Sequence, residues 1–340
     1  MKKVSVIFLL FISSVSDAQY KNLVFEGGGT RGLAYAGAVH ALEQKGVLAN
    51  VEKVAGTSAG AIIGMMLALG YNSKEIDSIM FGLRIQKFND GNGGLVGKYK
   101  RAKKYYGIHK GDAFENWLEG LVEKKTGNPF FTFAQLDSLS KRNKNYRQFA
   151  CVGTNLSKQR SETFSFANSP SMPLKTAVRI SCSIPFFYEP VLIDSAGKQI
   201  KEPVRGYNYQ VYADGGILAN YPVNIFDSCK NMGNPLFCDS IFYNKETLGF
   251  KLDRKEQVDQ YPSSTDITPY NIRNLKEYGA AFFNLIMETM NRKAALLNEK
   301  DRTVYIPYSD LFSNPKKVSD AEKKEMYESG RAATEKFFNK

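Results

Sequence analysis

Histidine is scarce in this sequence, whose 340 residues include only His40 and His109. Because no histidine follows residue 109 and most of the acidic residues come after it, a hydrolase triad in the chain order serine, acid, histidine is disfavoured. The four cysteines contain no Cys-x-x-C pair. With so few histidines and no paired cysteines, a zinc site is disfavoured. We therefore expect neither a metal nor a cofactor.

Long apolar runs are also lacking. The N-terminal run from Val4 to Val15 is too short to span a hydrocarbon core of about 30 Å. It follows two lysines and precedes Ser16-Asp17-Ala18. A positive start, a short apolar stretch and small residues at its end are typical of a secretory signal peptide, here residues 1–18. The alternatives are a membrane anchor or a buried first strand. The signal peptide predicts export, to a periplasm or out of the cell.

An exported chain meets an oxidising compartment, where cysteines can pair. Cys229 and Cys238 lie close enough in sequence to close a short loop. Cys151 and Cys182 lie in apolar segments, as buried free thiols often do.

The chain is basic, with a formal net charge of +12. This charge favours acidic partners, such as nucleic acid, anionic lipid or a phosphorylated substrate. No nucleic-acid-binding motif accompanies the charge, so we expect no nucleic acid as a partner. Nothing in the sequence indicates an oligomeric state.

Two strand–helix pairs follow the N-terminal segment. Apolar runs ended by glycine predict strands over residues 21–26 and 51–55, and helical spacing predicts helices over 32–48 and 61–69. This order predicts an α/β fold with a parallel sheet. No linker divides the chain, so we expect one domain over 19–340. Later patterns predict strands over 148–155, 163–166, 211–213 and 240–251, and helices over 112–125, 173–182, 271–297 and 321–338.

The second strand runs into Gly56-Thr57-Ser58-Ala59-Gly60, a G-x-S-x-G motif at a strand-to-helix junction. A nucleophilic serine needs a sharp turn, and only small residues fit around that turn. The helix that follows also directs N–H groups at the site. The alternative is an ordinary Gly/Ser turn.

A second glycine-rich segment, Gly27-Gly28-Gly29-Thr30-Arg31-Gly32, follows the first strand. Its N–H groups could form an anion-binding nest. It also matches the G-x-G-x-x-G dinucleotide motif, but that motif expects an acidic residue at the end of the second strand, where this chain has the serine turn. An oxyanion hole for a tetrahedral acyl intermediate fits better.

A catalytic serine needs a base, and the candidates are a carboxylate, a lysine, or His109 in an unusual chain order. Asp214 is the best of these, because it ends a short strand and precedes Gly215 and Gly216, which allow close approach of the backbone. A carboxylate can act as the base if its environment raises its pKa. The alternative is a simple turn.

Together, the three glycine-containing motifs resemble the patatin-like phospholipase family, over a core of residues 23–225. The segments after Ala177 and after Asp214 also resemble family segments. The resemblance implies a three-layer α/β/α fold with a mainly parallel central sheet. It implies Ser58 as nucleophile, Asp214 as general base, and the N–H groups of Gly27, Gly28 and Gly29, with Arg31, as the oxyanion hole. The remaining motif glycines are Gly32, Gly56, Gly60, Gly215 and Gly216.

The resemblance also implies a lipid acyl hydrolase without a metal, one that cleaves carboxylic esters of phospholipids, lysophospholipids or neutral acyl lipids through an acyl-serine. An acyltransferase using the same acyl-serine, and a catalytically idle lipid-binding protein, are the alternatives. Residues beyond about 230 resemble no family segment, and about 265–340 is expected to be a helical extension.

One segment outside the motifs combines lysines with tyrosines. Glycine and asparagine positions predict a long surface loop over 86–106, and Lys98 to Tyr106 is its basic, aromatic part. Such a segment suits peripheral contact with an anionic membrane. The alternative is a solvated loop.

Overall fold

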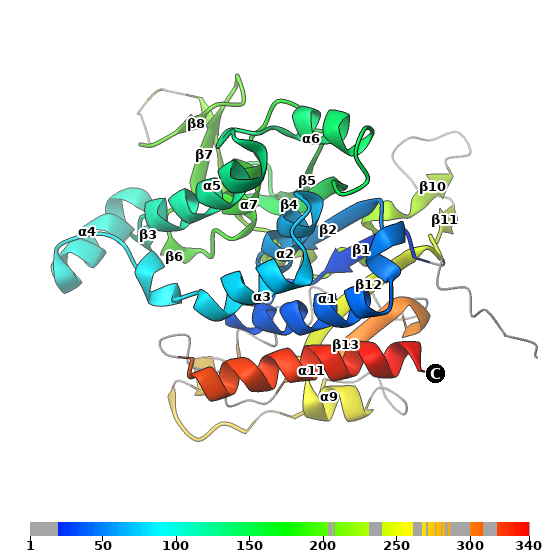
Figure 1. Ribbon diagram of the computed structural model, residues 1–340. Coiled ribbons are helices and arrows are strands. Elements are labelled where there is room, and N and C mark those ends of the chain that lie inside the picture. Colours follow the sequence, from blue (N-terminus) through cyan, green and yellow to red (C-terminus); the bar gives the residue numbers. More distant parts are fainter. Residues whose placement is uncertain are drawn as a thin grey trace, which may run out of the picture.

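The computed structural model describes residues 20–202, 206, 208–230, 240–260, 267–269, 271–275, 277–279, 281–282, 285, 300–308 and 318–339 (Figure 1). The predicted signal peptide and Cys238 lie outside these residues, as does most of the helix predicted over 271–297. The signal peptide, the Cys229–Cys238 pair and that helix therefore stay predictions.

Strand β1 (Asn22–Phe25) lies inside a nine-stranded sheet, not at its edge. Two parallel neighbours flank it, β2 (Lys53–Thr57) and β12 (Thr247–Arg254). The parallel part of the sheet continues through β4 (Gln148–Asn155) next to β2 and β13 (Thr303–Tyr308) next to β12. The β1–β2 part was expected from the sequence. The C-terminal extension, expected to be helical, also contributes β13.

The remaining strands of the sheet pair antiparallel with their neighbours. Strand β5 (Arg160–Ser165) lies along the edge of β4 opposite β2. Strand β9 (Tyr209–Asp214) continues along the same edge of β4 as β2, and β7 (Val191–Asp194) and β8 (Gln199–Ile200) follow it. Two short pairs lie outside the sheet, β3 (Gly107–His109) with β6 (Phe186–Tyr188) and β10 (Ser228–Lys230) with β11 (Ser240–Phe242).

Helices cover the sheet and confirm the expected α/β layers (Figure 1). The α-helices are α1 (Ala34–Gln44), α2 (Ala59–Ala68), α3 (Ser73–Gly82), α4 (Gly94–Tyr105), α5 (Asp112–Thr126), α6 (Phe133–Ser140), α7 (Leu174–Ser181), α8 (Gly216–Ala219), α9 (Lys255–Gln260) and α11 (Asp320–Phe338). The 3-10 helices are η1 (Gly29–Leu33), η2 (Val47–Asn50), η3 (Ile85–Phe88), η4 (Val223–Phe226) and η5 (Lys300–Arg302). None of the described helices combines the length and apolar character needed to cross a bilayer.

The two faces of the sheet have different cores. Successive strand residues point to opposite faces, so Leu23 and Phe25 join the main core beneath the helices, whereas Val24 belongs to a small cluster with Ala55 and Ala150. Ile225 and Phe226, both in η4, pack against that small cluster. The strand that leads to the first glycine segment is therefore buried on both faces.

The last described helix, α11, lies along α1 at very close range (Figure 1). A Cβ atom added at Gly330 would lie 1.8 Å from the carbonyl oxygen of Ala34, and one at Gly37 would lie 1.9 Å from that of Tyr327. Glycine at both positions lets the two backbones touch. The C-terminal helix is thus part of the core around α1.

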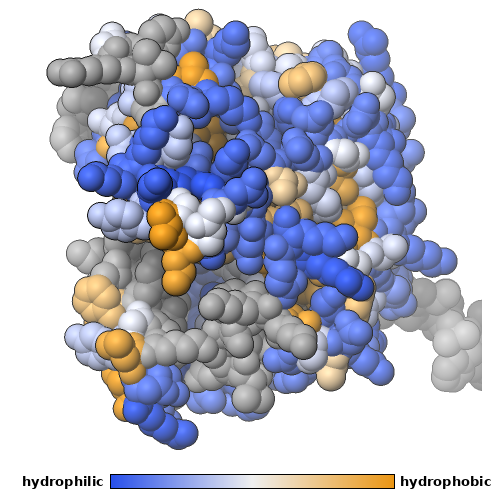
Figure 2. Space-filling model, turned by 90° about the vertical axis from the view of Figure 1, so that its left-hand side faces the viewer, coloured by the Kyte–Doolittle hydropathy of each residue, from blue (hydrophilic) through white to orange (hydrophobic). Residues whose placement is uncertain are grey.

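The loop predicted over 86–106 is wrong in its second half, where the chain forms helix α4. The glycines at 91, 93 and 94 do take positive φ angles, but the helix-forming residues after them continue as a helix. The glycine and asparagine positions indicated a loop, and no inward apolar stripe marked the helix, because it turns its apolar side chains to solvent. Figure 2, which faces the side of the molecule where α4 lies in Figure 1, shows apolar groups standing out among hydrophilic ones.

Candidate active site

Ser58 lies in a sharp turn between β2 and α2. Its φ of 52° and ψ of −120° form a conformation that costs a non-glycine residue free energy and is typical of a nucleophile elbow. A Cβ atom at Gly60 would lie 2.2 Å from the carbonyl oxygen of Phe25, and one at Gly56 would lie 2.4 Å from Gly60. The two glycines therefore let the turn close against β1.

The register of β4 brings Ser58 and Asp214 together. Strand β2 ends with Thr57 opposite Val152, and β9 ends with Asp214 opposite Gly153. The two strands thus end beside neighbouring residues of β4. As a result, the Ser58 hydroxyl donates a hydrogen bond to Asp214 Oδ2 over 2.8 Å.

Asp214 is buried, with 6% of its surface exposed. Desolvation raises the pKa of its carboxyl to about 6, although hydrogen bonds from the Gly216 amide and from Ser58 oppose this rise. The Gly216 amide donates to Oδ1 over 2.7 Å. One carboxylate oxygen is therefore held by the backbone while the other faces Ser58. A carboxyl with this pKa is mostly ionised at neutral pH and can accept a proton.

Both histidines have other partners. His40, in α1, contacts Asp77 at 3.1 Å. His109, in β3, contacts the carbonyl oxygen of Asp90 at 3.1 Å, and its ring packs on Phe187. Among the described residues, no lysine makes a hydrogen bond to Ser58. Of the three kinds of base left open by the sequence, only the carboxylate of Asp214 contacts the serine in the part of the chain that the structure describes.

The first glycine segment lies beside the serine. A Cβ atom at Gly27 would lie 3.3 Å from Ser58 Cβ. The Gly27 amide, however, donates to the carbonyl oxygen of Asn220 over 3.0 Å. Among the described residues, the amides of Gly28 and Gly29 have no such backbone acceptor, so these two N–H groups remain as candidate oxyanion donors.

Arg31 supports the glycine segment. Its Nε donates to the carbonyl oxygen of Gly28 over 3.2 Å, and its guanidinium lies 4.3 Å from the centre of the Tyr308 ring in β13. These contacts fix the loop from outside. They differ from the expected direct help with the oxyanion.

Asn220 is a site residue that the sequence reasoning missed. Its side-chain amide donates to Glu26 Oε1 and to the carbonyl oxygen of Gly27, each over 3.1 Å. A Cβ atom added at Gly27 would lie 2.3 Å from Asn220 Oδ1, and one added at Gly216 would lie 2.8 Å from the same oxygen. Asn220 thus fills the space between the first glycine segment and the glycines after Asp214. Its place in the segment that starts at Asp214 was the available signal.

Ser181 was missed as well, because it lies at the end of α7, far from the motifs in sequence. Its hydroxyl accepts a hydrogen bond from the Ser58 amide over 2.9 Å, and its carbonyl oxygen accepts one from the Gly215 amide over 3.3 Å. The Ser58 amide is therefore engaged by Ser181. The end of α7 holds the elbow and the Asp214 turn at once.

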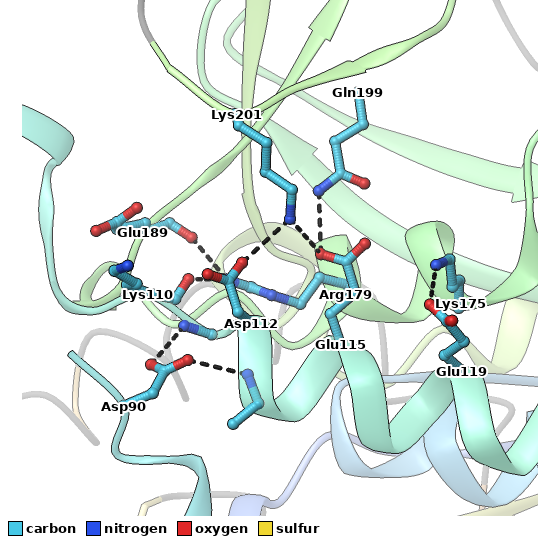
Figure 3. A network of polar contacts seen from close by, with 12 residues as sticks. Asp90, Lys110, Asp112, Glu115, Glu119, Lys175, Arg179, Glu189, Gln199 and Lys201 are labelled. Carbon is cyan, nitrogen blue, oxygen red and sulfur yellow. Dashed lines mark hydrogen bonds and ion pairs between the residues drawn. The ribbon is translucent and has the colours of Figure 1, made fainter.

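A polar network behind α7 keeps this end in place (Figure 3). Arg179, with 3% exposure, donates to the carbonyl oxygens of Lys110 and Glu189, each over 3.0 Å. It also donates to Ser183 Oγ over 2.5 Å, and the Ser183 carbonyl accepts from the Asp214 amide over 2.8 Å. Arg179 therefore links the segment that carries Asp214 to β3 and the chain after β6.

The thiols near the site are buried and inert. Cys151 and Cys182 are both free, as expected. Burial raises the pKa of both thiols, so neither forms the thiolate that nucleophilic chemistry needs. Within the described residues, no group of three or more histidine, cysteine or acidic side chains is placed to hold a metal ion.

Comparison with known proteins assigns the family. The model of the patatin-like phospholipase family matches residues 23–227, which include all three motifs. The chain belongs to the patatin-like phospholipase family. This match agrees closely with the core of 23–225 expected from the motifs, and it confirms the fold expected from the resemblance.

Similar proteins differ in how much of this chain they match. YqhO of Bacillus subtilis is 29% identical over 325 residues, which cover 94% of this chain and 98% of YqhO. The protein named Probable lipid hydrolase 463L, of Invertebrate iridescent virus 6, is 24% identical over 65% of this chain and 68% of its own length. Among solved structures, VipD of Legionella pneumophila has a TM-score of 0.58 at 18% identity and covers 94% of this chain and 67% of VipD. The likeness to VipD concerns the fold, and that to YqhO extends beyond residue 227.

Proposed function

We propose that this patatin-like protein hydrolyses carboxylic esters of lipids through an acyl-serine at Ser58, with Asp214 as the general base. The observation that carries the proposal is the 2.8 Å hydrogen bond from Ser58 Oγ to a buried carboxyl whose pKa is raised to about 6. Phospholipids, lysophospholipids and neutral acyl lipids are the candidate substrates. The family and a relative named as a lipid hydrolase support a lipid ester as the substrate class.

In the proposed mechanism, Asp214 takes the proton of Ser58 while Oγ attacks the ester carbonyl carbon. The negative oxygen of the tetrahedral intermediate accepts hydrogen bonds from the amides of Gly28 and Gly29. When the intermediate collapses, the bond to the alcohol breaks, and the alcohol leaves with the proton held by Asp214. Asp214 next takes a proton from water, and the resulting hydroxide attacks the acyl-serine. When this second intermediate collapses, Asp214 returns its proton to Ser58 Oγ and the fatty acid is released.

The test uses residues 19–340, the chain that cleavage of the predicted signal peptide would leave. Hydrolysis of a short p-nitrophenyl ester and of a panel of phospholipid, lysophospholipid and triacylglycerol is compared between this protein, Ser58→Ala and Asp214→Asn. We expect both variants to lose at least about a thousandfold in rate. Ser161→Ala and Asp259→Asn, at exposed positions, are matched controls that should retain the rate.

Each other outcome has a definite meaning. Full activity in Ser58→Ala contradicts the proposed nucleophile. Labelling of Ser58 by a fluorophosphonate without hydrolysis, but with acyl transfer to glycerol or a lysolipid, indicates an acyltransferase. Failure of both labelling and turnover leaves a catalytically idle lipid-binding protein.

We also propose that residues 1–18 are removed on export, as their composition suggests. Mass spectrometry of the protein recovered from the periplasm and the medium of a bacterial host tests this proposal. A mature N-terminus at Gln19 is the expected result, and recovery of the full chain from the cytoplasm contradicts it.

A further inference from the structure

Helix α4 presents apolar side chains to solvent. The exposed fractions are 86% for Leu95, 66% for Val96 and 70% for Tyr99. Leu95 and Tyr99 lie one turn apart, so they point to the same side of the helix. Exposed large apolar groups are common singly, but a contiguous group rimmed by polar residues marks an interaction surface. Figure 2 faces the side on which α4 lies and shows apolar groups there surrounded by hydrophilic ones.

The side of α4 that faces the protein is anchored by the guanidinium of Arg101. Arg101 is 9% exposed, its Nε lies 3.4 Å from Glu189 Oε1, and its Nη2 donates to the carbonyl oxygen of Asn92 over 3.4 Å. Gly91 leaves room for the guanidinium, because a Cβ there would lie 2.3 Å from Nη2. The outward direction of the apolar residues is therefore fixed by an inward anchor. Arg101 does not belong to the basic surface that the sequence suggested.

The same helix is strongly basic on its outer side. It contains four lysines and no acidic residue: Lys98, Lys100, Lys103 and Lys104. Lys100 and Lys103 are exposed and have no acidic partner among the described residues. Lys104 lies 3.7 Å from Glu202, in an exposed pair of little strength. The outer side thus combines apolar groups with uncompensated positive charge.

Two further exposed aromatic residues lie just after α4 and in β6. Tyr106 and Phe186 are 50% and 79% exposed. Strand β3 begins at Gly107, which pairs with Phe186 in β6, so Tyr106 lies beside the start of that pair. Phe186 follows Ser183 by three residues, and the Ser183 carbonyl binds the Asp214 amide. The segment that carries Phe186 therefore also holds the backbone of the proposed base through one hydrogen bond.

We propose that the α4 surface, made of Leu95, Val96, Tyr99, Lys100, Lys103, Tyr106 and Phe186, binds an anionic lipid bilayer. Apolar side chains enter the interface while the lysines contact acidic head groups, which is how basic amphipathic helices bind membranes. A second copy of this chain is a poor occupant, because the lysines of both copies would face each other. The inference rests on the proposed lipid substrate, since it explains how the site reaches lipid in a membrane.

The test measures binding to sonicated vesicles by co-sedimentation. Vesicles of phosphatidylcholine alone are compared with vesicles that also contain phosphatidylglycerol. All proteins are residues 19–340 with Ser58→Ala, so that no lipid is consumed. The charge variant is Lys100→Glu with Lys103→Glu. Its matched control is Lys324→Glu with Lys336→Glu, which makes the same change in net charge at exposed positions of α11.

We expect the parent protein to bind the anionic vesicles and the charge variant to bind them at least about 25-fold more weakly. The α11 control should bind within about threefold of the parent, and added salt should weaken binding by screening. Leu95→Gln with Val96→Gln should weaken binding about tenfold or more, because two apolar side chains no longer leave water. Phe242→Gln, at another exposed apolar residue, should leave binding unchanged.

Three results would overturn the proposal: no vesicle binding by the parent, equal binding by the charge variant, or an equal loss in the α11 control. A fourth is a dimer of the parent in analytical ultracentrifugation that Leu95→Gln with Val96→Gln abolishes, because the surface would then be a self-interface. The vesicle assay needs no hydrolysis, and the same α4 variants with Ser58 intact should hydrolyse the soluble p-nitrophenyl ester at the parent rate. Failure of this inference and failure of the proposed function are thus separate results.

Discussion

Ser58 and Asp214, 156 residues apart in sequence, are in hydrogen-bond contact because each lies where a strand ends beside β4. Thr57 pairs with Val152, and Asp214 pairs with Gly153. One strand that carries neither residue therefore sets the distance between them. The motifs that carry Ser58 and Asp214 need only lie at the ends of β2 and β9, because the pairing of these strands with β4 then brings the two side chains together.

The rate of ester hydrolysis should depend on pH through Asp214. The base must be ionised, and burial raises the pKa of this carboxyl to about 6. We therefore expect kcat/KM for a soluble ester to rise with pH and level off above an apparent pKa near this value. A profile already flat from pH 5 upward would contradict Asp214 as the base in this environment.

Asp214→Asn should stabilise the protein at high pH while removing activity. The carboxyl pKa rises from 3.8 to about 6 on folding, so between these values the native state binds more protons than the unfolded state. The free energy of unfolding therefore falls as pH rises through this window, by about 3 kcal/mol in total. An uncharged asparagine avoids this penalty.

Thermal melting of Asp214→Asn and of its parent, at pH 3.5 and pH 8, checks this expectation. The difference in favour of the variant should appear at the higher pH and vanish at the lower. Asp259→Asn, at a position that is 62% exposed, should show no such pattern. A variant that melts below its parent at pH 8 would refute the argument.

Asn220→Ala should lower turnover without removing either member of the dyad. The side chain of Asn220 binds Glu26 and Gly27 and separates the two glycine turns, so its loss lets the candidate oxyanion donors shift. We expect kcat to fall about ten- to a hundredfold with little change in KM. The apparent pKa of the pH profile should stay near that of the parent, because Asp214 keeps its own hydrogen bonds.

Asn224→Ala, four residues further at an exposed position, is the control and should retain the parent kcat. Equal kcat values for Asn220→Ala and its parent would show that Asn220 does not position the loop.

Gly60→Ala should destabilise the fold by about 3 kcal/mol or more. The added methyl group would lie 2.2 Å from the carbonyl oxygen of Phe25, a backbone atom that cannot move aside cheaply. Gly82→Ala, in α3, meets nothing within 4 Å and should be neutral or slightly stabilising. Urea unfolding of the two variants compares them directly, and equal midpoints would contradict the close packing of the elbow against β1.

The sequence predicted the parts of the site that glycine spacing encodes. The two turns after β1 and β2 and the turn after Asp214 each need glycine for a local reason, so their motifs are visible without a structure. The scarcity of histidine also led to the carboxylate. These signals are local in the chain, which is why they could be interpreted directly.

The site residues and the helix that the sequence did not predict depend on long-range contacts or on a helix whose apolar side faces solvent. Asn220 and Ser181 act through partners that only the folded sheet brings near, so no spacing marks them. Helix α4 was predicted as a loop because its N-terminal glycines resemble a turn and because Arg101, not an apolar residue, faces inward. The pairing of β12 with β1 joins segments more than two hundred residues apart, beyond the reach of periodicity.

Because β1 lies between two strands, its packing during synthesis depends on residues that are made much later. Strand β1, which leads to the first glycine segment, is among the first parts of the fold to be made. Its partner β12 ends only at Arg254, and α11, which packs on α1, ends only at Phe338. Until those residues exist, β1 is an unprotected edge and α1 lacks its cover. A nascent chain that lacks these residues therefore cannot complete the packing around β1 and α1, and the proposed active site has to wait for α11.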